Sequence, residues 1–207
     1  MALTPGYGET PLPHDELAAL LPAVVDVLDK PVRRVDVYDL EQEFQNHVFD
    51  ELMPEALDGS LSIDELLNEY FVRDLHSRMF GRIWNWAGHW RRIELNIGVS
   101  PEQVAIELRN SLGTIRYRWQ HTDDWDARQL GIAVHAEVVR IHPFIDGNGR
   151  TSRLLADLVY AAVQNPTELQ YDWDIVKSRY IELLRTYDRV RDITELAAFI
   201  GVVPISS

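Results

Sequence analysis

The side chains with the most chemical potential in this chain fall within thirteen residues, 141 to 153. The stretch reads IHPFIDGNGRTSR and places one histidine, one aspartate, one asparagine and two arginines around a proline and two glycines. A histidine with a pKa of about 6.5 can remove a proton from a hydroxyl near neutral pH. A single carboxylate can cap a helix or hold a magnesium ion that bridges phosphates. These residue types predict either a polar turn between helices or a site for an anion.

The spacing within the stretch favours the anion site. Proline disfavours helical geometry in the residue before it, so a helix should end at His142 and present the imidazole at a loop. Gly147 and Gly149 allow the backbone to approach a ligand, and the next helix should begin beside them with unpaired N–H groups that suit phosphate. Arg150 and Arg153 then share a face of the first turns, where cations oppose the helix dipole unless an anion is bound.

Three residues of the stretch keep a structural alternative. Asp146 either caps the helix or binds magnesium, and its two oxygens could serve both roles. Asn148 is either a turn residue or a phosphate contact. A lone histidine such as His142 is often no more than a cap at a helix end, and only the complete set favours a phosphate site.

The elements around this stretch are predicted to be helices. Apolar residues recur at spacings of three and four, and Ser62 with Glu65 forms a capping-box pattern. Helices are expected at residues 14–28, 36–52, 62–80, 101–119, 130–141, 154–162, 171–189 and 192–201. Residues 91–99 alternate in polarity and predict a short β-hairpin or an extended flap, not a helix. The expected organisation is an irregular arm at 1–13, a helical extension at 14–60 and one mainly α domain at 61–207.

Composition limits the class of protein. The 207 residues carry a net charge of -13, which disfavours broad attraction to nucleic acid or to an anionic membrane. The chain has no cysteine, so disulfides, thiolate zinc sites and cysteine nucleophiles are excluded. No signal peptide and no apolar run long enough to cross a bilayer is present, so a cytoplasmic location is expected.

The stretch resembles the signature of the Fic/Doc (Fido) family, which runs His-Pro-Phe-x-Asp/Glu-Gly-Asn-Gly-Arg-x-x-Arg. Every specified position is met. Two further segments are similar to the family's entry into its flap and to its closing helices: LHSRMFGRIWNWAGHWR and RYIELLRTYDRVRDITELAAFI. The resemblance covers about Leu61 to Phe199 and implies a Fic-type helical bundle. The N-terminal ETPL and the length further resemble the small Fic proteins called mobile mystery protein B.

The resemblance implies an enzyme, a protein adenylyltransferase that moves AMP from ATP to a Ser, Thr or Tyr hydroxyl of a target protein. In that role His142 would be the catalytic base that deprotonates the hydroxyl. Asp146 would hold a Mg²⁺ cofactor on the α- and β-phosphates. Phe144 would anchor the loop in the core beneath the nucleotide.

The phosphate contacts are also implied by the resemblance. The backbone amides of Gly147 and Gly149 would cradle phosphate, with help from Asn148. Arg150 would contact the leaving phosphates and Arg153 the γ-phosphate. The phosphorylating branch of the family has Ala and Lys at the two glycine positions, which makes its inverted nucleotide pose a poor fit here.

Two further surfaces are implied with less support from the residues themselves. The flap would pair with the target chain as an added strand, through Arg91, Ile93, Glu94, Leu95, Asn96 and Ile97. Arg91 and Arg92 could equally be solvated. Tyr180 and Tyr187 would lie near the adenine pocket, although aromatic residues at helical spacing usually face the core.

One feature of many family members is missing. Their inhibitory helix carries Ser/Thr-x-x-x-Glu-Gly/Asn, and no glutamate of this chain is followed by Gly or Asn. A separate inhibitory protein is therefore expected, as in the toxin-antitoxin branch. The alternatives that stay open are transfer of another group, such as UMP or phosphate, and a non-catalytic protein-binding module.

Overall fold

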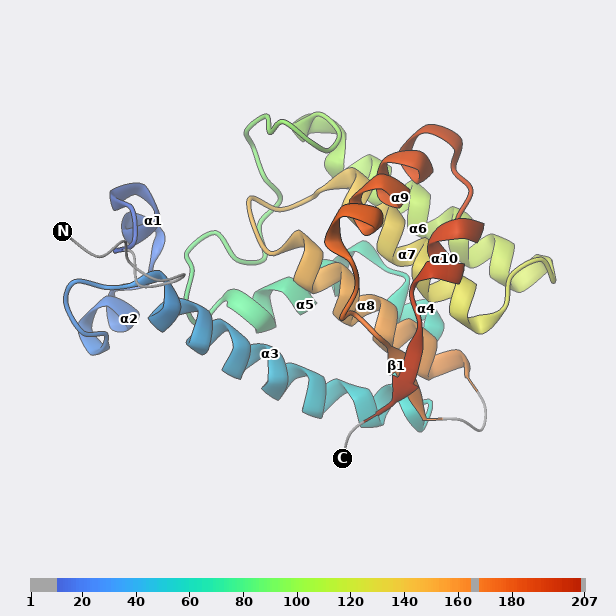
Figure 1. Cartoon of the computed structure of the whole chain (residues 1–207), viewed down its shortest axis with the longest axis horizontal. Coiled ribbons are helices and arrows are strands. Elements are labelled where there is room, and N and C mark those ends of the chain that lie inside the picture. The colour runs from blue at the N-terminus through green and yellow to red at the C-terminus, as the bar shows by residue number, and fades with distance from the viewer. Residues whose placement is uncertain (1–10, 165–167, 206–207) are drawn as a thin grey trace.

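The computed structural model describes residues 11–164 and 168–205, and most of the arm predicted at 1–13 lies outside them. Its first helices are α1 (His14–Ala19), α2 (Pro22–Val27), α3 (Arg34–Leu57), α4 (Ile63–Leu66) and α5 (Glu69–Phe80). A 3₁₀ turn (Pro101–Gln103) leads into α6 (Val104–His121), α7 (Ala127–Ile141) and α8 (Asn148–Val163). The chain closes with α9 (Lys177–Val190) and α10 (Thr194–Phe199). The prediction of a mainly α fold is confirmed (Figure 1).

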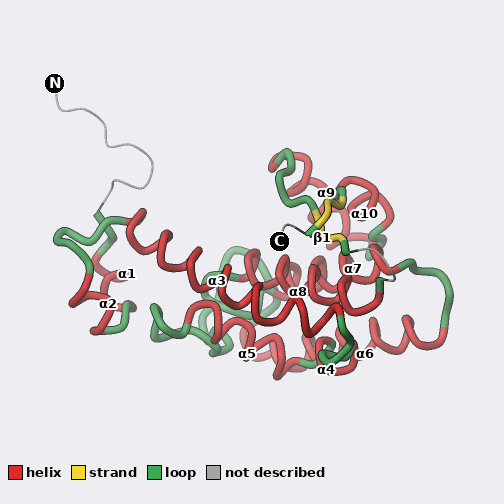
Figure 2. The backbone as a smooth tube through the Cα atoms, turned by 90° about the horizontal axis from the view of Figure 1, so that it is seen from below, coloured by secondary structure: helices red, strands yellow, loops and turns green. Residues whose placement is uncertain are grey.

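Helix α8 lies at the centre of the helical body and packs against α3, α4, α5 and α7 (Figure 1). Its apolar residues Leu154, Leu155 and Leu158 are buried, and each such side chain contributes about 1.5–3 kcal/mol of transfer free energy. The start of α8 is therefore fixed by a helix that the core holds on several sides. Helices α1 and α2 lie at one end of the molecule in both views (Figures 1 and 2).

Several helix boundaries differ from the predicted ones. The helix expected at 14–28 is two short helices, because Pro22 begins a new helix instead of bending the first. Helix α3 continues past Pro54, where the sequence predicted a break. Ser62 does form the expected capping box with Glu65, but the helix ends at Leu66 and α5 begins three residues later.

The predicted β-hairpin at residues 91–99 is wrong. That segment is a loop, and the strands of the described residues are β1 (Leu169–Tyr171) and β2 (Val202–Pro204). They pair antiparallel with Leu169 opposite Pro204 and Tyr171 opposite Val202. The loop at 91–99 lacks a partner strand, and its hydrogen bonds go to the segment around His142. We call residues 91–99 the flap loop from here on.

None of the helices in the described ranges combines the length and the apolar composition needed to span a bilayer.

Candidate functional site

His142 ends α7 in a conformation that few residues adopt. Its backbone has φ 54° and ψ 62°, the left-handed region, and its N–H donates to the carbonyl of Val138. The proline that follows excludes a further helical turn. Burial holds the pKa of the half-buried imidazole below its usual value, the charge of Arg91 lowers it further, and nearby Asp146 opposes both effects. The ring is therefore neutral at pH 7 and can accept a proton.

Gly147 sets the start of α8. Its φ is 75°, and a Cβ built on it would lie 2.7 Å from Cε2 of Phe80 and 3.1 Å from Nε2 of His76. A residue with a side chain is excluded there by both conformation and space. The first helical bond is donated by Thr151 N–H to the Gly147 carbonyl, so the amides of residues 148–150 precede the helical ladder. These amides are the groups that a phosphate can accept from.

The loop between the two helices is held from inside. Asn148 accepts from the Phe144 N–H at 2.9 Å and donates back to the Phe144 carbonyl at 2.8 Å. Phe144 is fully buried, and its ring stacks on His76 with centroids 3.6 Å apart. Asn148 is itself 2% exposed, and the two hydrogen bonds of its side-chain amide fix the conformation of the loop. Of its two predicted roles, the structure places it in the structural one.

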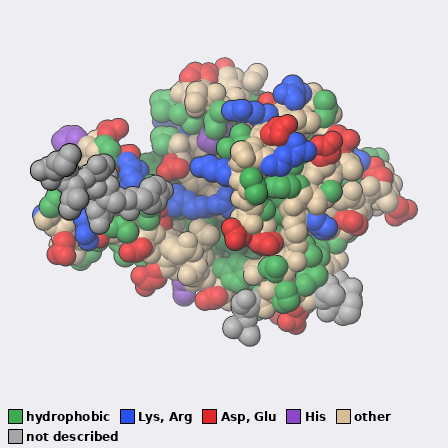
Figure 3. Space-filling model, viewed as in Figure 1, with side chains coloured by type: hydrophobic (Ala, Val, Ile, Leu, Met, Phe, Trp, Pro, Cys, Tyr) green, Lys and Arg blue, Asp and Glu red, His purple; other side chains and the backbone are tan. Residues whose placement is uncertain are grey.

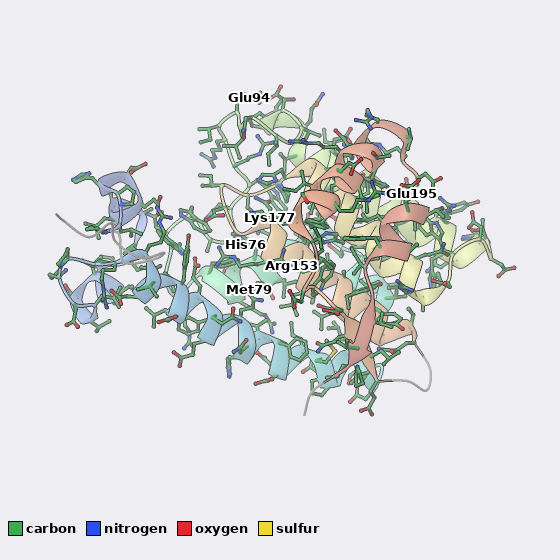
Figure 4. All side chains as sticks on the ribbon, in the orientation of Figure 1. His76, Met79, Glu94, Arg153, Lys177 and Glu195 are labelled. Atoms are coloured by element: carbon green, nitrogen blue, oxygen red, sulfur yellow. The ribbon has the colours of Figure 1, made fainter. Side chains whose placement is uncertain are left out.

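A cleft of about 560 Å³ lies beside the start of α8. Its lining comes from α3, the loop, α8 and α9: Tyr38, Glu41, Gln42, Gln45, Asp146, Gly147, Gly149, Arg150, Arg153 and Lys177. Lys and Arg side chains gather around the hollow in the middle of the face shown in Figure 3. Arg153 and Lys177, from different helices, both border it (Figure 4). The cleft is therefore locally basic in an acidic chain.

Asp146 borders this cleft and leaves its carboxylate largely in solvent, with 67% of the side chain exposed. One oxygen accepts from the Gly147 N–H at 2.7 Å, and the other lies 3.8 Å from Nη2 of Arg150. No group of three or more metal-ligating side chains occurs among the described residues. A single exposed carboxylate fits Mg²⁺, which commonly takes one or two carboxylates and completes its shell with phosphates and water.

The two arginines of the stretch have different surroundings. Arg150 forms an ion pair with Glu41 of α3 and lies 4.6 Å from the ring centroid of Phe80. Glu41 is 2% exposed, and its second oxygen accepts from the Trp84 indole at 2.7 Å. Arg150 is thus neutralised by a carboxylate that is itself fixed.

Arg153 has no carboxylate within ion-pair distance in the part of the chain that the structure describes. Its guanidinium lies 6.0 Å from the ring centroid of Trp173, and its charge partly offsets the rise that burial causes in the pKa of nearby Tyr180. Of the two arginines, it is the one whose charge stays available to an anion in the cleft.

The flap loop is tied to the segment around His142. The Arg91 N–H donates to the Pro143 carbonyl at 2.9 Å, and the Val99 N–H donates to the Ile141 carbonyl at 3.3 Å. Ile93 and Ile97 are about half exposed, Glu94 and Asn96 are exposed, and Leu95 is partly buried. Arg91 differs from both of its predicted roles, because its side chain is 2% exposed and reaches neither solvent nor a target.

The two tyrosines predicted near adenine occupy different places. The Tyr187 hydroxyl donates to buried Glu137 at 2.5 Å and borders a separate hollow between α6, α7 and α9. The Tyr180 hydroxyl lies 2.7 Å from Nε2 of His135 and beside Arg153. Only Tyr180 is near the residues of the cleft.

Glu41, Lys177 and the inward orientation of Arg91 were not found from the sequence. Glu41 is one of several carboxylates on α3, and its contact with Arg150 spans 109 residues of chain. Lys177 is one of only two lysines, which is the one signal that could have singled it out.

Comparison with known proteins bears on the same residues. Residues 66–160 match the family model described as Fic/DOC family. Over 104 residues the chain is 33% identical to protein adenylyltransferase fic-1 of Caenorhabditis elegans, a match that covers 48% of this chain and 19% of that protein. The chain therefore spans about a fifth of the length of the curated relatives it matches.

Solved structures share the fold. The BepC protein of Bartonella tribocorum, crystallised with bound AMPPNP, superposes with a TM-score of 0.60 at 14% identity, covering 84% of this chain and 89% of that one. A Fic domain containing signaling protein from Bacteroides thetaiotaomicron gives a TM-score of 0.56 at 24% identity, over 72% and 57% of the two chains. The narrower resemblance to mobile mystery protein B stays a prediction. Residues 66–160 of this chain thus match the Fic/DOC family, and its fold is the one that these solved structures share.

Proposed function

We propose that this chain transfers AMP from ATP to a hydroxyl of a target protein. The observation that carries the proposal is the cleft at the start of α8. It holds unpaired backbone amides and the available charge of Arg153, and the loop between α7 and α8 connects it to the neutral imidazole of His142. The relatives that match at about 33% identity are named protein adenylyltransferase. The fold neighbour BepC was crystallised with a nucleotide triphosphate analogue.

His142 is the base in this proposal. Its imidazole accepts the proton of the target hydroxyl while the hydroxyl oxygen attacks the α-phosphorus of ATP. The bond between the α-phosphorus and the bridging oxygen breaks, and pyrophosphate leaves with that electron pair. The lowered pKa of His142 keeps the ring unprotonated at neutral pH, which is the state a general base needs.

The triphosphate lies along the cleft in this proposal. The amides at the start of α8 and the side chain of Arg153 hold its oxygens, and Lys177 adds a third cationic group from α9. Arg150 contributes less net charge, because Glu41 is paired with it. His142 does not border the cleft, so the α-phosphate must reach past Asp146 to meet the attacking oxygen.

Asp146 would hold Mg²⁺ through its exposed oxygen. When bound, the ion neutralises charge on the phosphates of the nucleotide. The protein's own part is to keep that carboxylate in solvent and in place, which the Gly147 N–H does from one side.

A protein target and a separate inhibitory protein complete the proposal. The exposed isoleucines of the flap loop, Ile93 and Ile97, offer apolar contact to an extended target segment beside His142. The inhibitor follows from a missing motif, since no glutamate is followed by Gly or Asn. Glu41 pairs with Arg150, and no carboxylate of the described residues pairs with Arg153. The charge of Arg153 is therefore left for a separate inhibitory protein to neutralise.

Replacing the base tests the proposal. His142→Ala is expected to reduce incorporation of AMP about 100- to 10,000-fold, the usual contribution of a positioned general base. The measurement is intact mass of the chain and of candidate targets after incubation with ATP and magnesium. Nucleotide affinity and melting temperature should change little, and exposed His121→Ala serves as the matched control. Full incorporation by the His142→Ala variant would rule out the assigned base.

A further inference from the structure

Arg91 is the largest of the fully buried side chains, although it precedes an exposed loop. Arginine is rarely buried without a carboxylate partner, since moving an unpaired charge out of water is costly. No carboxylate of residues 11–164 or 168–205 forms an ion pair with it. The site of Arg91 must therefore compensate the charge by other means.

Backbone carbonyls provide the compensation. Nε donates to the His142 carbonyl at 2.7 Å, Nη1 donates to the Ile93 carbonyl at 3.0 Å, and Nη2 donates to the Val99 carbonyl. A guanidinium holds its donors in one rigid plane, so these three acceptors are fixed relative to one another. The acceptors come from the beginning of the flap loop, its end, and the residue proposed as the base.

The bond from Arg91 to the His142 carbonyl acts on a strained part of the backbone. It belongs to a residue in the left-handed conformation, which costs an L-residue about 1 kcal/mol or more and persists only when its surroundings impose it. It also ends α7, where carbonyls lack helical partners and cations are favourable. The same two backbone angles set the direction of this carbonyl and that of the Cα–Cβ bond that carries the imidazole.

The flap loop approaches the same point from the other side. A Cβ built on Gly98 would lie 2.7 Å from the Cβ of His142 and 2.8 Å from Nη2 of Arg91. Gly98 has φ 93°, so only glycine fits. The three residues thus form one packed junction between loop and base.

We propose that Arg91 is a positioning residue that couples the flap loop to His142, so that a target segment seated on Ile93 and Ile97 is held in register with the imidazole. The inference rests on the proposed function, because it assigns the purpose of the junction to transfer. The contacts of Arg91 do not include any residue of the cleft, so nucleotide binding is independent of it.

The test replaces Arg91 by Gln and by Lys, with Arg109→Gln as the control on an exposed arginine of α6, outside the flap loop. In Arg91→Gln, kcat for AMP transfer should fall about 10- to 100-fold, the usual cost of a misplaced catalytic group. The dissociation constant of a fluorescent ATP analogue should stay within about twofold of the wild type. Arg109→Gln should match the wild type in both measurements.

A titration separates positioning from general loss of structure. The cation of Arg91 lowers the pKa of His142, so Arg91→Gln should raise that pKa and move the acid limb of the transfer rate to higher pH. Arg91→Lys keeps the charge and should preserve the titration while still slowing transfer. The pKa is read from the His142 imidazole resonance by NMR, assigned with His142→Ala, and needs no activity.

The proposal is overturned if Arg91→Gln leaves transfer unchanged, or if it weakens nucleotide binding as much as it slows transfer. An unchanged His142 titration overturns it as well. If Arg91→Gln does not fold, Gly98→Ala disturbs the same junction with the guanidinium intact, and unaltered transfer by that variant counts against the proposal. If the wild type transfers nothing, the proposed function fails while the NMR titration still decides whether Arg91 acts on His142.

Discussion

His76 shows at the residue scale how the loop of the candidate site is supported from outside the motif. Its Nδ1 accepts from the Gly88 N–H at 2.9 Å, and its Nε2 lies 3.1 Å from the Asp146 carbonyl. Because Nδ1 accepts, the ring proton sits on Nε2 and is donated to Asp146. A second proton on Nδ1 would break the bond to Gly88. Burial lowers the pKa of His76 to about 4, because the protonated ring would be cut off from water. The neutral ring is also the form that makes both hydrogen bonds.

This shift makes folding sensitive to acid. The folded-state pKa of about 4 lies below the ordinary value of about 6.5, so the unfolded chain binds more protons between those two pH values. Stability from His76 is complete above pH 6.5 and is lost as the pH falls towards 4. His76→Gln keeps an acceptor and a donor but does not titrate.

We predict that the difference in unfolding free energy between wild type and His76→Gln shrinks by about 2–3 kcal/mol from pH 7 to pH 4. Urea denaturation at several pH values measures it, with the variant at exposed His121, His121→Gln, as control. A difference that stays constant over this pH range would contradict the prediction. Buried His135 titrates in both proteins and cancels in the comparison.

Some site residues could be predicted from the sequence and others could not, for a physical reason. His142, Asp146 and the glycines act within a short loop, so their types and spacing carry the information. Arg91 and Glu41 act through contacts 51 and 109 residues away along the chain. Nothing local distinguishes a buried arginine from a solvated one, and only tertiary packing decides.

At the scale of elements, helix α9 places two tyrosine hydroxyls seven residues apart in separate environments. The Tyr180 hydroxyl lies 2.7 Å from Nε2 of His135 and close to Arg153. Burial raises the pKa of Tyr180, and the positive charge of Arg153 partly offsets that shift. Tyr187 instead donates to Glu137, away from the cleft. One helix therefore orients Arg153 with its first turn and packs the core with its third.

The matched pair Tyr180→Phe and Tyr187→Phe tests this division. Losing the Tyr180 hydroxyl should weaken binding of ATP about 3- to 10-fold, the equivalent of one ordinary hydrogen bond beside Arg153. Losing the Tyr187 hydroxyl should lower the melting temperature and leave nucleotide affinity unchanged. Calorimetric titration with a non-hydrolysable ATP analogue measures both. Equal effects of the two variants on affinity would show that the hydroxyl of Tyr180 has no special role.

The helices were predictable because burial of one face requires a regular spacing, as in the Leu154, Leu155 and Leu158 face of α8. The flap loop was not, because alternating polarity also occurs where a chain runs over the surface. Its carbonyls at Ile93 and Val99 are satisfied by the side chain of Arg91, where a hairpin would use a second strand. The short β1–β2 sheet was missed because three residues give no measurable period.

At the scale of the whole molecule, a chain with net charge -13 places three cationic side chains and only two carboxylates around the candidate cleft. The chain has two lysines, and Lys177 borders the cleft while the Lys30 ammonium donates to the Val25 carbonyl at 2.7 Å in the N-terminal extension. Lys30 is thus an internal reference for any measurement on Lys177. A local basic site in an acidic protein favours a small anion over an extended polyanion.

We predict that ATP protects Lys177, but not Lys30, from acetylation by an amine-selective reagent. The physical reason is that phosphates in the cleft would both cover and pair with the Lys177 ammonium. Peptide mass spectrometry gives the rate at each lysine with and without nucleotide. Equal labelling of Lys177 in the two conditions, with ATP binding established separately, would place the phosphates elsewhere.

The central claim is that the chain moves AMP, and the position of a label in ATP tests it most directly. The wild-type chain, alone and with a cell extract, is incubated with magnesium and ATP labelled on either the α- or the γ-phosphate. Label retained on protein is measured as the excess over the same incubation without the chain. The account predicts retention from α-labelled ATP alone, and none with His142→Ala. Retention from γ-labelled ATP, or incorporation from labelled UTP in place of ATP, would contradict it.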